Sequence, residues 1–301
     1  MNKIELFNSS LNTTRDDRHF RWKDYRHNVN SLLSSNFDKL EDKDLIVVIG
    51  AGRCDDFSLD LLVENFNKVV LTDVDLSSVK EAVDRYDFTK EERSKIFMER
   101  VEYTGLEKNQ FFEDFEASLL LYKDTESIEG FIDRKLEDLD KYRFLKGYVG
   151  QANFVLVTPI YTQLAYQQVL LSCAKLRSTG YPENLLKFVE GYMGEKLVSI
   201  FETFNKNIVN ALGDGYLFVL SDIFQDYSDS KFMIDVKRRI DSFSKMEELY
   251  ETYQSHYGYG MGDLGLLILD EQVNKVDSKW LLWPFSKGVD LVVKFAIYKS
   301  K

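Results

Sequence analysis

Short apolar segments alternate with amphipathic segments along most of this chain. Residues 45–50, 68–75 and 153–161 read LIVVIG, KVVLTDVD and NFVLVTPIY. These apolar runs, rich in β-branched residues, predict buried strands. The segments after the first two, 57–66 and 76–86, carry apolar residues at helical spacing and predict helices. Strands that alternate with helices in this way predict a parallel sheet covered by helices on both faces.

The remaining strands are predicted from weaker patterns. A third strand is expected near RVEYTG at 100–105. A fifth strand is expected in DGYLFVLSDIF at 214–224, where a Gly-Asp-Gly turn over 213–215 leads into it. Residues 279–301 predict two strands joined by a turn at 286–288, so that the last strand runs antiparallel to its neighbour. The predicted fold class is therefore α/β, with a doubly wound, mostly parallel seven-stranded sheet that ends in an antiparallel C-terminal hairpin.

Two helical additions lie outside this repeating pattern. Residues 19–35 place four apolar residues on one helical stripe, and residues 1–40 are therefore interpreted as an N-terminal helical extension. The stripe consists of Trp22, Tyr25, Val29 and Leu32. Residues 108–147 have helical periodicity and no strand signal, which predicts a helical insertion. Later helices are expected over 163–177, from Pro182 to about Ala211, and over 231–254. No long flexible linker divides the chain, so residues 1–301 predict a single domain.

A glycine-rich turn follows the first predicted strand. Gly50 and Gly52 flank Ala51 at the point where ligands bind in doubly wound sheets. Glycine lets the backbone approach a ligand without Cβ atoms in the way. Asp73 ends the next strand 23 positions after Gly50, about the separation at which a carboxylate reaches the hydroxyls of a ribose. The pattern therefore indicates a nucleoside site. The alternative is a tight turn with Asp73 capping the next helix.

The acidic residues after this turn narrow the choice of nucleoside. Asp55 occupies the third glycine position of a dinucleotide fingerprint, and Asp56 follows it. Two carboxylates within about 5 Å of a bound pyrophosphate would repel it and weaken its binding by on the order of a few kcal/mol. S-adenosylmethionine carries no phosphate but has a sulfonium and an ammonium group, so the acidic edge favours it over NAD. A nicotinamide-dependent oxidoreductase on a related sheet and a non-catalytic binding protein are the alternatives.

These segments resemble the class I S-adenosylmethionine-dependent methyltransferases. VVIGAGRCDD is similar to the first motif of that family, with Cys54 in place of its third glycine. The resemblance implies Asp73 as the ribose acid, with Asp75 as the alternative. FVLVTPIYTQLAY resembles the fourth strand and the loop that lines the methyl-transfer site. The cofactor-binding residues that the resemblance implies are Gly50, Ala51, Gly52, Asp73, Val74, Asp75, Thr158 and Pro159.

The chemistry predicted is methyl transfer to a small-molecule acceptor, with O, N or S as the methylated atom. Tyr161 is the candidate catalytic residue, placed to orient or deprotonate the acceptor, although it could equally pack under the sheet. Other candidates near the site are Gln163 and Asp222, with His19 and His256 as possible bases. An aromatic wall for a flat or cationic acceptor is expected from Trp22, Tyr25, Trp280 and Trp283. The N-terminal helix and the 108–147 insertion are predicted to cap the acceptor side of the sheet.

Composition and charge exclude several other classes. The formal net charge of −11 argues against nucleic-acid or anionic-membrane surfaces. The two cysteines and three histidines form no disulfide framework and match no metal-ligand spacing. No apolar run reaches the roughly 18 residues of a membrane helix, and the N-terminus lacks the apolar centre of a signal peptide. The expected location is cytoplasmic, and the composition fits a bacterial source.

Overall fold

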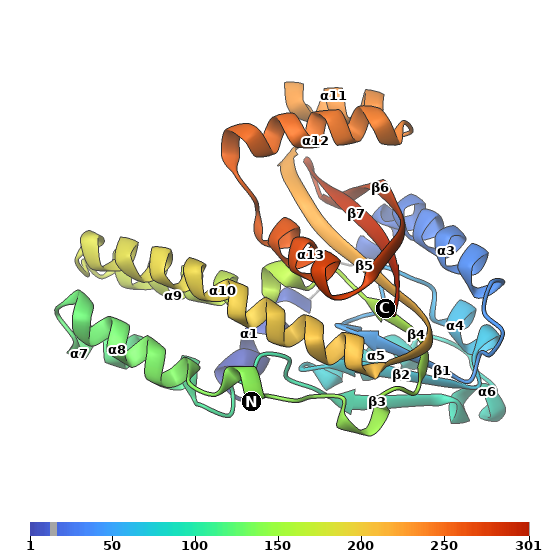
Figure 1. Cartoon of the computed structure of the whole chain (residues 1–301), viewed down its shortest axis with the longest axis horizontal. Helices are drawn as coiled ribbons and strands as arrows, with labels where there is room; N and C mark the ends of the chain where they lie inside the picture. Colours follow the sequence, from blue (N-terminus) through green and yellow to red (C-terminus); the bar gives the residue numbers. More distant parts are fainter. Residues whose placement is uncertain (13–16, 301) are drawn as a thin grey trace.

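The computed structural model describes residues 1–12 and 17–300. Its centre is a seven-stranded sheet with the strand order β3-β2-β1-β4-β5-β7-β6 (Figure 1). The strands are β1 (Leu45–Ile49), β2 (Lys68–Asp73), β3 (Ile96–Arg100), β4 (Ala152–Val157), β5 (Leu212–Tyr227), β6 (Asn274–Ser286) and β7 (Val289–Lys299). The pairs among β1 to β5 are parallel, whereas β7 runs antiparallel to both β5 and β6. The predicted fold class, including the C-terminal hairpin, is confirmed.

Helices cover both faces of this sheet because the inner strands are apolar on both sides. On β1, Val47 and Ile49 join one buried cluster, whereas Ile46 and Val48 join the cluster on the other face. The first cluster is completed by α7 (Phe111–Leu121), α8 (Thr125–Leu136), α9 (Tyr166–Ser178), α10 (Glu183–Ala211) and α13 (Met261–Gln272). The second is completed by α3 (Lys23–Phe37), α4 (Leu59–Asn65) and α5 (Leu76–Asp84). The short helix α6 (Lys90–Ser94) leads into β3.

A separate small cluster lies beyond the main body of the sheet. Helices α11 (Lys231–Arg239) and α12 (Phe243–Tyr257) pack against Phe224, Trp280 and Val292 of the long strands β5, β6 and β7. Figure 1 shows both helices at the top of the view, beyond the ends of these strands. The predicted helical segment 231–254 is thus two helices.

The third strand lies earlier in the chain than predicted. It spans 96–100 and pairs in parallel with β2, Asp73 opposite Arg100. Beyond it, the carboxylate of Glu102 accepts hydrogen bonds from the backbone N–H groups of Thr104 (2.8 Å) and Gly105 (2.6 Å). This local turn replaces the strand because the side chain satisfies backbone groups that a strand would pair with its neighbour.

Helix α1 (Lys3–Asn12) lies in the predicted N-terminal extension but was not predicted as a separate helix, and α13 was not predicted at all. Helix α13 contains Gly262 and Gly265, and glycine disfavours helix interiors. A Cβ on Gly265 would lie 2.3 Å from the ring of Tyr161, and one on Gly262 would lie 2.1 Å from the carbonyl oxygen of Asp222. The two glycines are therefore required by close packing, which overrides their helix propensity.

The N-terminal extension and the insertion are helical, as predicted. Residues 19–35 fall in α2 (Arg18–Arg21) and α3, and the buried stripe continues through Leu33 to Phe37 rather than through Leu32. The insertion forms α7, α8 and two 3-10 turns, η1 (Leu139–Lys141) and η2 (Lys146–Tyr148). Among the described residues, no helix is both long and apolar enough to cross a membrane.

Candidate functional site

A cavity of about 430 Å³ lies along the carboxyl ends of β2, β1, β4 and β5. The chain passes from β1 to β2 and β3 on one side, and β4 then pairs with β1 on the other side. This reversal between β1 and β4 is the topological switch point at which doubly wound sheets bind ligands. The volume falls within the range of small-molecule sites.

The floor of the cavity is the glycine loop after β1. Gly50 and Gly52 have φ values of +73° and +49°, and Cys54 also has a positive φ of +52°. Cys54 therefore takes the left-handed conformation that glycine adopts most easily, so the loop keeps its path without a third glycine. A Cβ on Gly50 would lie 2.7 Å from the Oγ1 atom of Thr158, whose hydroxyl donates to the carbonyl of Gly50 at 2.7 Å.

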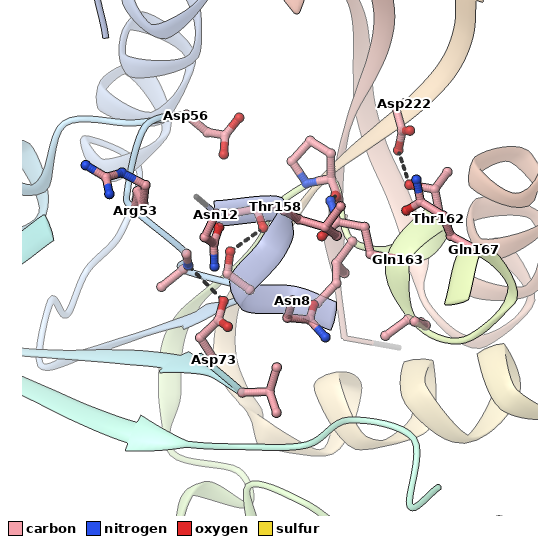
Figure 2. Close-up of a pocket in the computed structure, with 18 of the residues that line it drawn as sticks. Asn8, Asn12, Arg53, Asp56, Asp73, Thr158, Thr162, Gln163, Gln167 and Asp222 are labelled. Carbon is pink, nitrogen blue, oxygen red and sulfur yellow. Dashed lines mark hydrogen bonds between the residues drawn. The ribbon is translucent and has the colours of Figure 1, made fainter. Parts of the chain in front are cut away.

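Asp73 connects the end of β2 to this loop. Its Oδ2 atom accepts a hydrogen bond from the backbone N–H of Gly52 (2.8 Å), and its Oδ1 atom accepts one from the N–H of Asp75 (2.8 Å). Burial raises the pKa of Asp73 to about 6, against the opposing effect of these hydrogen bonds. Figure 2 shows the carboxyl group next to the loop, below Thr158 in the view. Val74 and Pro159 also line the cavity, with Ala51.

Asp75 does not line the cavity, which corrects its prediction as a cofactor-binding residue. It is the N-cap of α5 and accepts hydrogen bonds from the N–H and Oγ of Ser78 and from the Oγ of Ser77. The side-chain amide of Asn12 donates to it as well, at 3.0 Å. Burial acts to raise its pKa, but these hydrogen bonds outweigh burial and lower it. Asp75 thus fixes the start of α5 and the end of α1.

Tyr161 is also outside the cavity, so its prediction as the catalytic residue is wrong. Its side chain is buried, its hydroxyl donates to the Oδ1 atom of Asn205 at 2.7 Å, and its ring packs edge-on against Phe201 and Phe204. Burial raises its pKa far above the ordinary value. The 3-10 turn η3 (Tyr161–Gln163) directs Tyr161 toward α10 and α13, whereas Thr162 lines the cavity.

The end of the cavity near β5 and β6 is aromatic and acidic. Trp22 and Trp283 line it, with ring centroids 4.7 Å apart, and Phe285 stacks on Trp22 at 6.0 Å. Tyr25 stacks behind Trp283 without lining the cavity. Trp280 belongs to the separate cluster around Phe224, so the predicted aromatic wall is only partly right.

Asp222 and Asp56 are the carboxylates of this end. Burial raises the pKa of Asp222 to about 6; the Oδ1 atom of this residue accepts a hydrogen bond from Thr162 at 3.4 Å. Burial raises the pKa of Asp56 to about 7, and the nearby charge of Asp55 adds to this effect. Asp55 itself is paired with Arg85 at 3.2 Å, so only one of the two loop aspartates keeps the unpaired charge that the sequence suggested. Helix α4 begins at Leu59, with Ser58 at the N-cap position.

The N-terminal helix, and not the insertion, covers the cavity. Ile4, Asn8, Leu11 and Asn12 of α1 line it, whereas no residue of 108–147 does. The part of the N-terminal extension that covers the cavity is thus mainly α1 rather than the predicted helix at 19–35, of which Trp22 lines the cavity, and the insertion packs on α1 and α10 instead of covering it. An apolar spacing of Ile4, Phe7 and Leu11 is the sequence signal that could have identified α1.

The turn after β3 contributes residues that sequence reasoning missed as well. Glu102, Tyr103 and Thr104 line the cavity, and the Tyr103 hydroxyl accepts from the N–H of Gly50 at 2.9 Å. The mistaken placement of β3 concealed this turn. The two histidines considered as bases, His19 and His256, do not line the cavity.

No family model and no curated protein matches the chain. Among solved structures, it is similar to the N-methyltransferase NodS from Bradyrhizobium japonicum in complex with S-adenosyl-L-homocysteine, at 11% identity and a TM-score of 0.48, covering 99% of both chains. It is similar to an S-adenosylmethionine-dependent methyltransferase from Methanosarcina mazei at 10% identity and a TM-score of 0.43, covering 87% of this chain and 95% of that one. It is also similar to geranyl diphosphate methyltransferase in complex with S-adenosylmethionine, at 8% identity and a TM-score of 0.41, covering 96% and 92%.

The strand order and the antiparallel C-terminal hairpin agree with the fold that the sequence resemblance implies. At identities of 8–11% and TM-scores below 0.5, these likenesses carry no argument about ligand or acceptor. Both are inferred below from the residues of the cavity.

Proposed function

We propose that this protein binds S-adenosylmethionine and transfers its methyl group to a small-molecule acceptor. The observation that carries the proposal is the joint position of the glycine loop and Asp73 at the switch point of the sheet. Gly50 and Gly52 line the cavity with backbone and no side chain, and the hydrogen bond from Gly52 fixes the Asp73 carboxylate beside them. A nucleoside whose ribose hydroxyls donate to Asp73 fits this arrangement.

The charge of the cavity favours a cationic ligand over a dinucleotide. Asp56, Asp73 and Asp222 line it, as does Glu102. Arg18 and Arg53 also line it. The guanidinium of Arg53 is paired with Glu81 at 3.0 Å, and that of Arg18 donates a hydrogen bond to the carbonyl of Leu11 at 2.9 Å. A pyrophosphate would be repelled by the carboxylates, whereas a sulfonium and an ammonium group are attracted to them. The nicotinamide-dependent alternative is therefore disfavoured.

In the proposed reaction, S-adenosylmethionine supplies an activated methyl carbon, and the chain aligns an acceptor for in-line displacement. Asp73 and the glycine loop hold the nucleoside at the β2 and β1 end. Thr158 and Pro159 lie between this end and Asp222 on β5. The aromatic rings of Trp22 and Trp283 exclude water from the far end, where the acceptor binds.

Calorimetry with S-adenosylhomocysteine and with NAD⁺ tests the proposal. We expect binding of S-adenosylhomocysteine and no heat from NAD⁺ under the same conditions. Binding of NAD⁺ with no response to S-adenosylhomocysteine would contradict the proposal. A non-catalytic binding protein is distinguished by incubating the protein with labelled S-adenosylmethionine and candidate acceptors, because only an enzyme transfers the label.

A further inference from the structure

Both backbone polar groups of Gly50, the first residue of the glycine loop, are held by side-chain hydroxyls. Its N–H donates to the hydroxyl oxygen of Tyr103 at 2.9 Å, and its carbonyl accepts from the Oγ1 atom of Thr158 at 2.7 Å. Tyr103 lies in the turn after β3, and Thr158 directly follows β4. In the sheet, β3 and β4 lie on opposite sides of β1, so the loop is held from both directions.

The Tyr103 hydroxyl belongs to a hydrogen-bond relay whose direction is fixed. The hydroxyl of Thr72 donates to the carbonyl of Val48 at 2.7 Å and lies 2.9 Å from the hydroxyl of Tyr103. A threonine hydroxyl has a single proton, so Tyr103 must be the donor to Thr72. Burial raises the pKa of Tyr103 well above its ordinary value, so the phenol keeps the proton that it donates. Its oxygen is thereby left to accept from Gly50.

The next two N–H groups of the loop are held within the protein as well. The N–H of Ala51 donates to the carbonyl of Thr72 at 2.9 Å, and that of Gly52 donates to the Oδ2 atom of Asp73 at 2.8 Å. Phosphate sites in glycine loops depend on such N–H groups pointing at the ligand. With the N–H groups of residues 50–52 directed away from a ligand, the loop presents glycine Cα atoms and the Asp73 carboxylate, which suits a nucleoside rather than a pyrophosphate.

Tyr103 is itself fixed by the helical insertion and by α10. Its ring, only 5% exposed, packs edge-on against Phe144 and Phe204, with centroids 5.3 and 5.9 Å away. The hydroxyl of Tyr142 donates to the carbonyl of Glu102 at 2.7 Å, which holds the turn that carries Tyr103. Tyr142 and Phe144 belong to the insertion. The insertion lines no part of the cavity, yet it contacts the residue that holds the glycine loop.

We propose that Tyr103 is a positioning residue for the cofactor, which keeps Gly50 in the conformation that receives the nucleoside, and that the insertion positions Tyr103 in turn. This inference rests on the proposed function. Without the phenol oxygen, the Gly50 N–H loses its acceptor, and an unpaired N–H is unfavourable in a buried loop. The unliganded loop then rearranges to turn this N–H toward water. Binding of the nucleoside must reverse the rearrangement, so affinity falls.

Calorimetry of Tyr103→Phe with S-adenosylhomocysteine tests this inference. We expect binding about 5- to 50-fold weaker than in the unaltered protein, the effect of one unpaired buried group. Tyr161→Phe is the matched control, because it also removes a buried hydroxyl with an uncharged partner, Asn205, but lies outside the cavity. Its affinity should stay within about 2-fold of the parent. Both variants should lose stability, so a purely structural role would affect their melting temperatures alike and spare the affinity.

Hydrogen exchange of the Gly50 N–H, followed by NMR without any cofactor, gives a readout independent of the proposed function. Exchange should be at least about 10-fold faster in Tyr103→Phe than in the unaltered protein, and unchanged in Tyr161→Phe. Tyr142→Phe acts on the turn without removing any group of the relay. It should accelerate the same exchange and weaken S-adenosylhomocysteine binding by about 2- to 5-fold, less than Tyr103→Phe does.

The outcomes separate this inference from the proposed function. If S-adenosylhomocysteine does not bind the unaltered protein, the proposed function fails, and the positioning role fails with it. If it binds and Tyr103→Phe loses no more affinity than Tyr161→Phe, only the positioning role is overturned. Unchanged exchange at Gly50 in Tyr103→Phe would also overturn it. Parental affinity and exchange in Tyr142→Phe would overturn the part assigned to the insertion.

Discussion

The Oδ2 atom of Asp73 accepts a hydrogen bond from the backbone N–H of Gly52 at 2.8 Å, which ties the end of β2 to the loop after β1. The two residues are 21 positions apart in sequence, and the parallel pairing of β1 with β2 brings them together. A carboxylate held in this way is ready to accept further hydrogen bonds without reorganising. Its contribution to cofactor binding can therefore be measured by substitution.

Asp73→Ala should weaken S-adenosylhomocysteine binding by about 30- to 1,000-fold, the loss of two charge-assisted hydrogen bonds. Calorimetry gives the affinity and thermal unfolding gives the stability. Asp75→Ala is the matched comparison, since Asp75 caps α5 and does not line the cavity. It should cost about 1–2 kcal/mol of stability and change affinity by less than about 5-fold. A larger loss of affinity for Asp75→Ala than for Asp73→Ala would reverse the assignment.

Gly50→Ala should abolish cofactor binding and destabilise the fold. The substitution forces alanine to a φ of +73° and places its Cβ 2.7 Å from Thr158 Oγ1. The left-handed conformation alone costs about 1–2 kcal/mol. Gly150→Ala is the control, because Gly150 has a similar φ of +66° but nothing within 4 Å of the added Cβ. Denaturant unfolding should show a larger loss for Gly50→Ala, and equal losses would contradict the steric argument.

Tyr161→Phe should leave the rate of methyl transfer within about 2-fold of the unaltered protein and lower stability by about 1–2 kcal/mol. The hydroxyl is hydrogen-bonded to buried Asn205, whose side chain would lose that partner. Steady-state rates and melting temperatures measured together test both parts. If the turnover rate instead dropped by about two orders of magnitude while stability stayed the same, Tyr161 would be restored as a catalytic residue.

Stability should fall as pH rises from about 4 to 8. Asp56, Asp73 and Asp222 have folded-state pKa values raised to about 7, 6 and 6, above the ordinary value of 3.8. The folded state therefore holds protons that the unfolded state releases, and ionisation through this window destabilises the fold. These shifts of the pKa correspond to at most about 3 kcal/mol of unfolding free energy each for Asp73 and Asp222 and about 4–5 kcal/mol for Asp56. Melting temperatures measured across this pH range check the trend, and a stability that rises with pH would contradict it.

Asp56→Asn isolates one of these contributions. It removes a carboxylate whose charged form is disfavoured in the folded state, so it should raise the melting temperature at pH 8 by about 2 °C or more and change it little at pH 5. Melting curves at both pH values decide this. A variant less stable than its parent at pH 8 would show that the Asp56 charge is compensated in the folded state.

Local pattern was enough to predict much of the fold and part of the site. The apolar runs that became β1, β2 and β4 are buried on both faces, so each reads as a strand without knowledge of its partners. The positions of Gly50, Gly52 and Asp73 at the cavity were predictable because they depend on backbone conformation and strand ends, which the chain encodes over short distances.

Only the tertiary structure decided which side chains reach the cavity. Tyr161 and Thr162 are adjacent, yet a 3-10 turn and the space left by Gly265 direct the first into the core, while the second faces Asp222. Asp55 and Asp56 are adjacent too, but Arg85 from α5's C-terminal end neutralises only Asp55. Burial, pairing and orientation depend on contacts between residues far apart in sequence, and no local pattern carries that information.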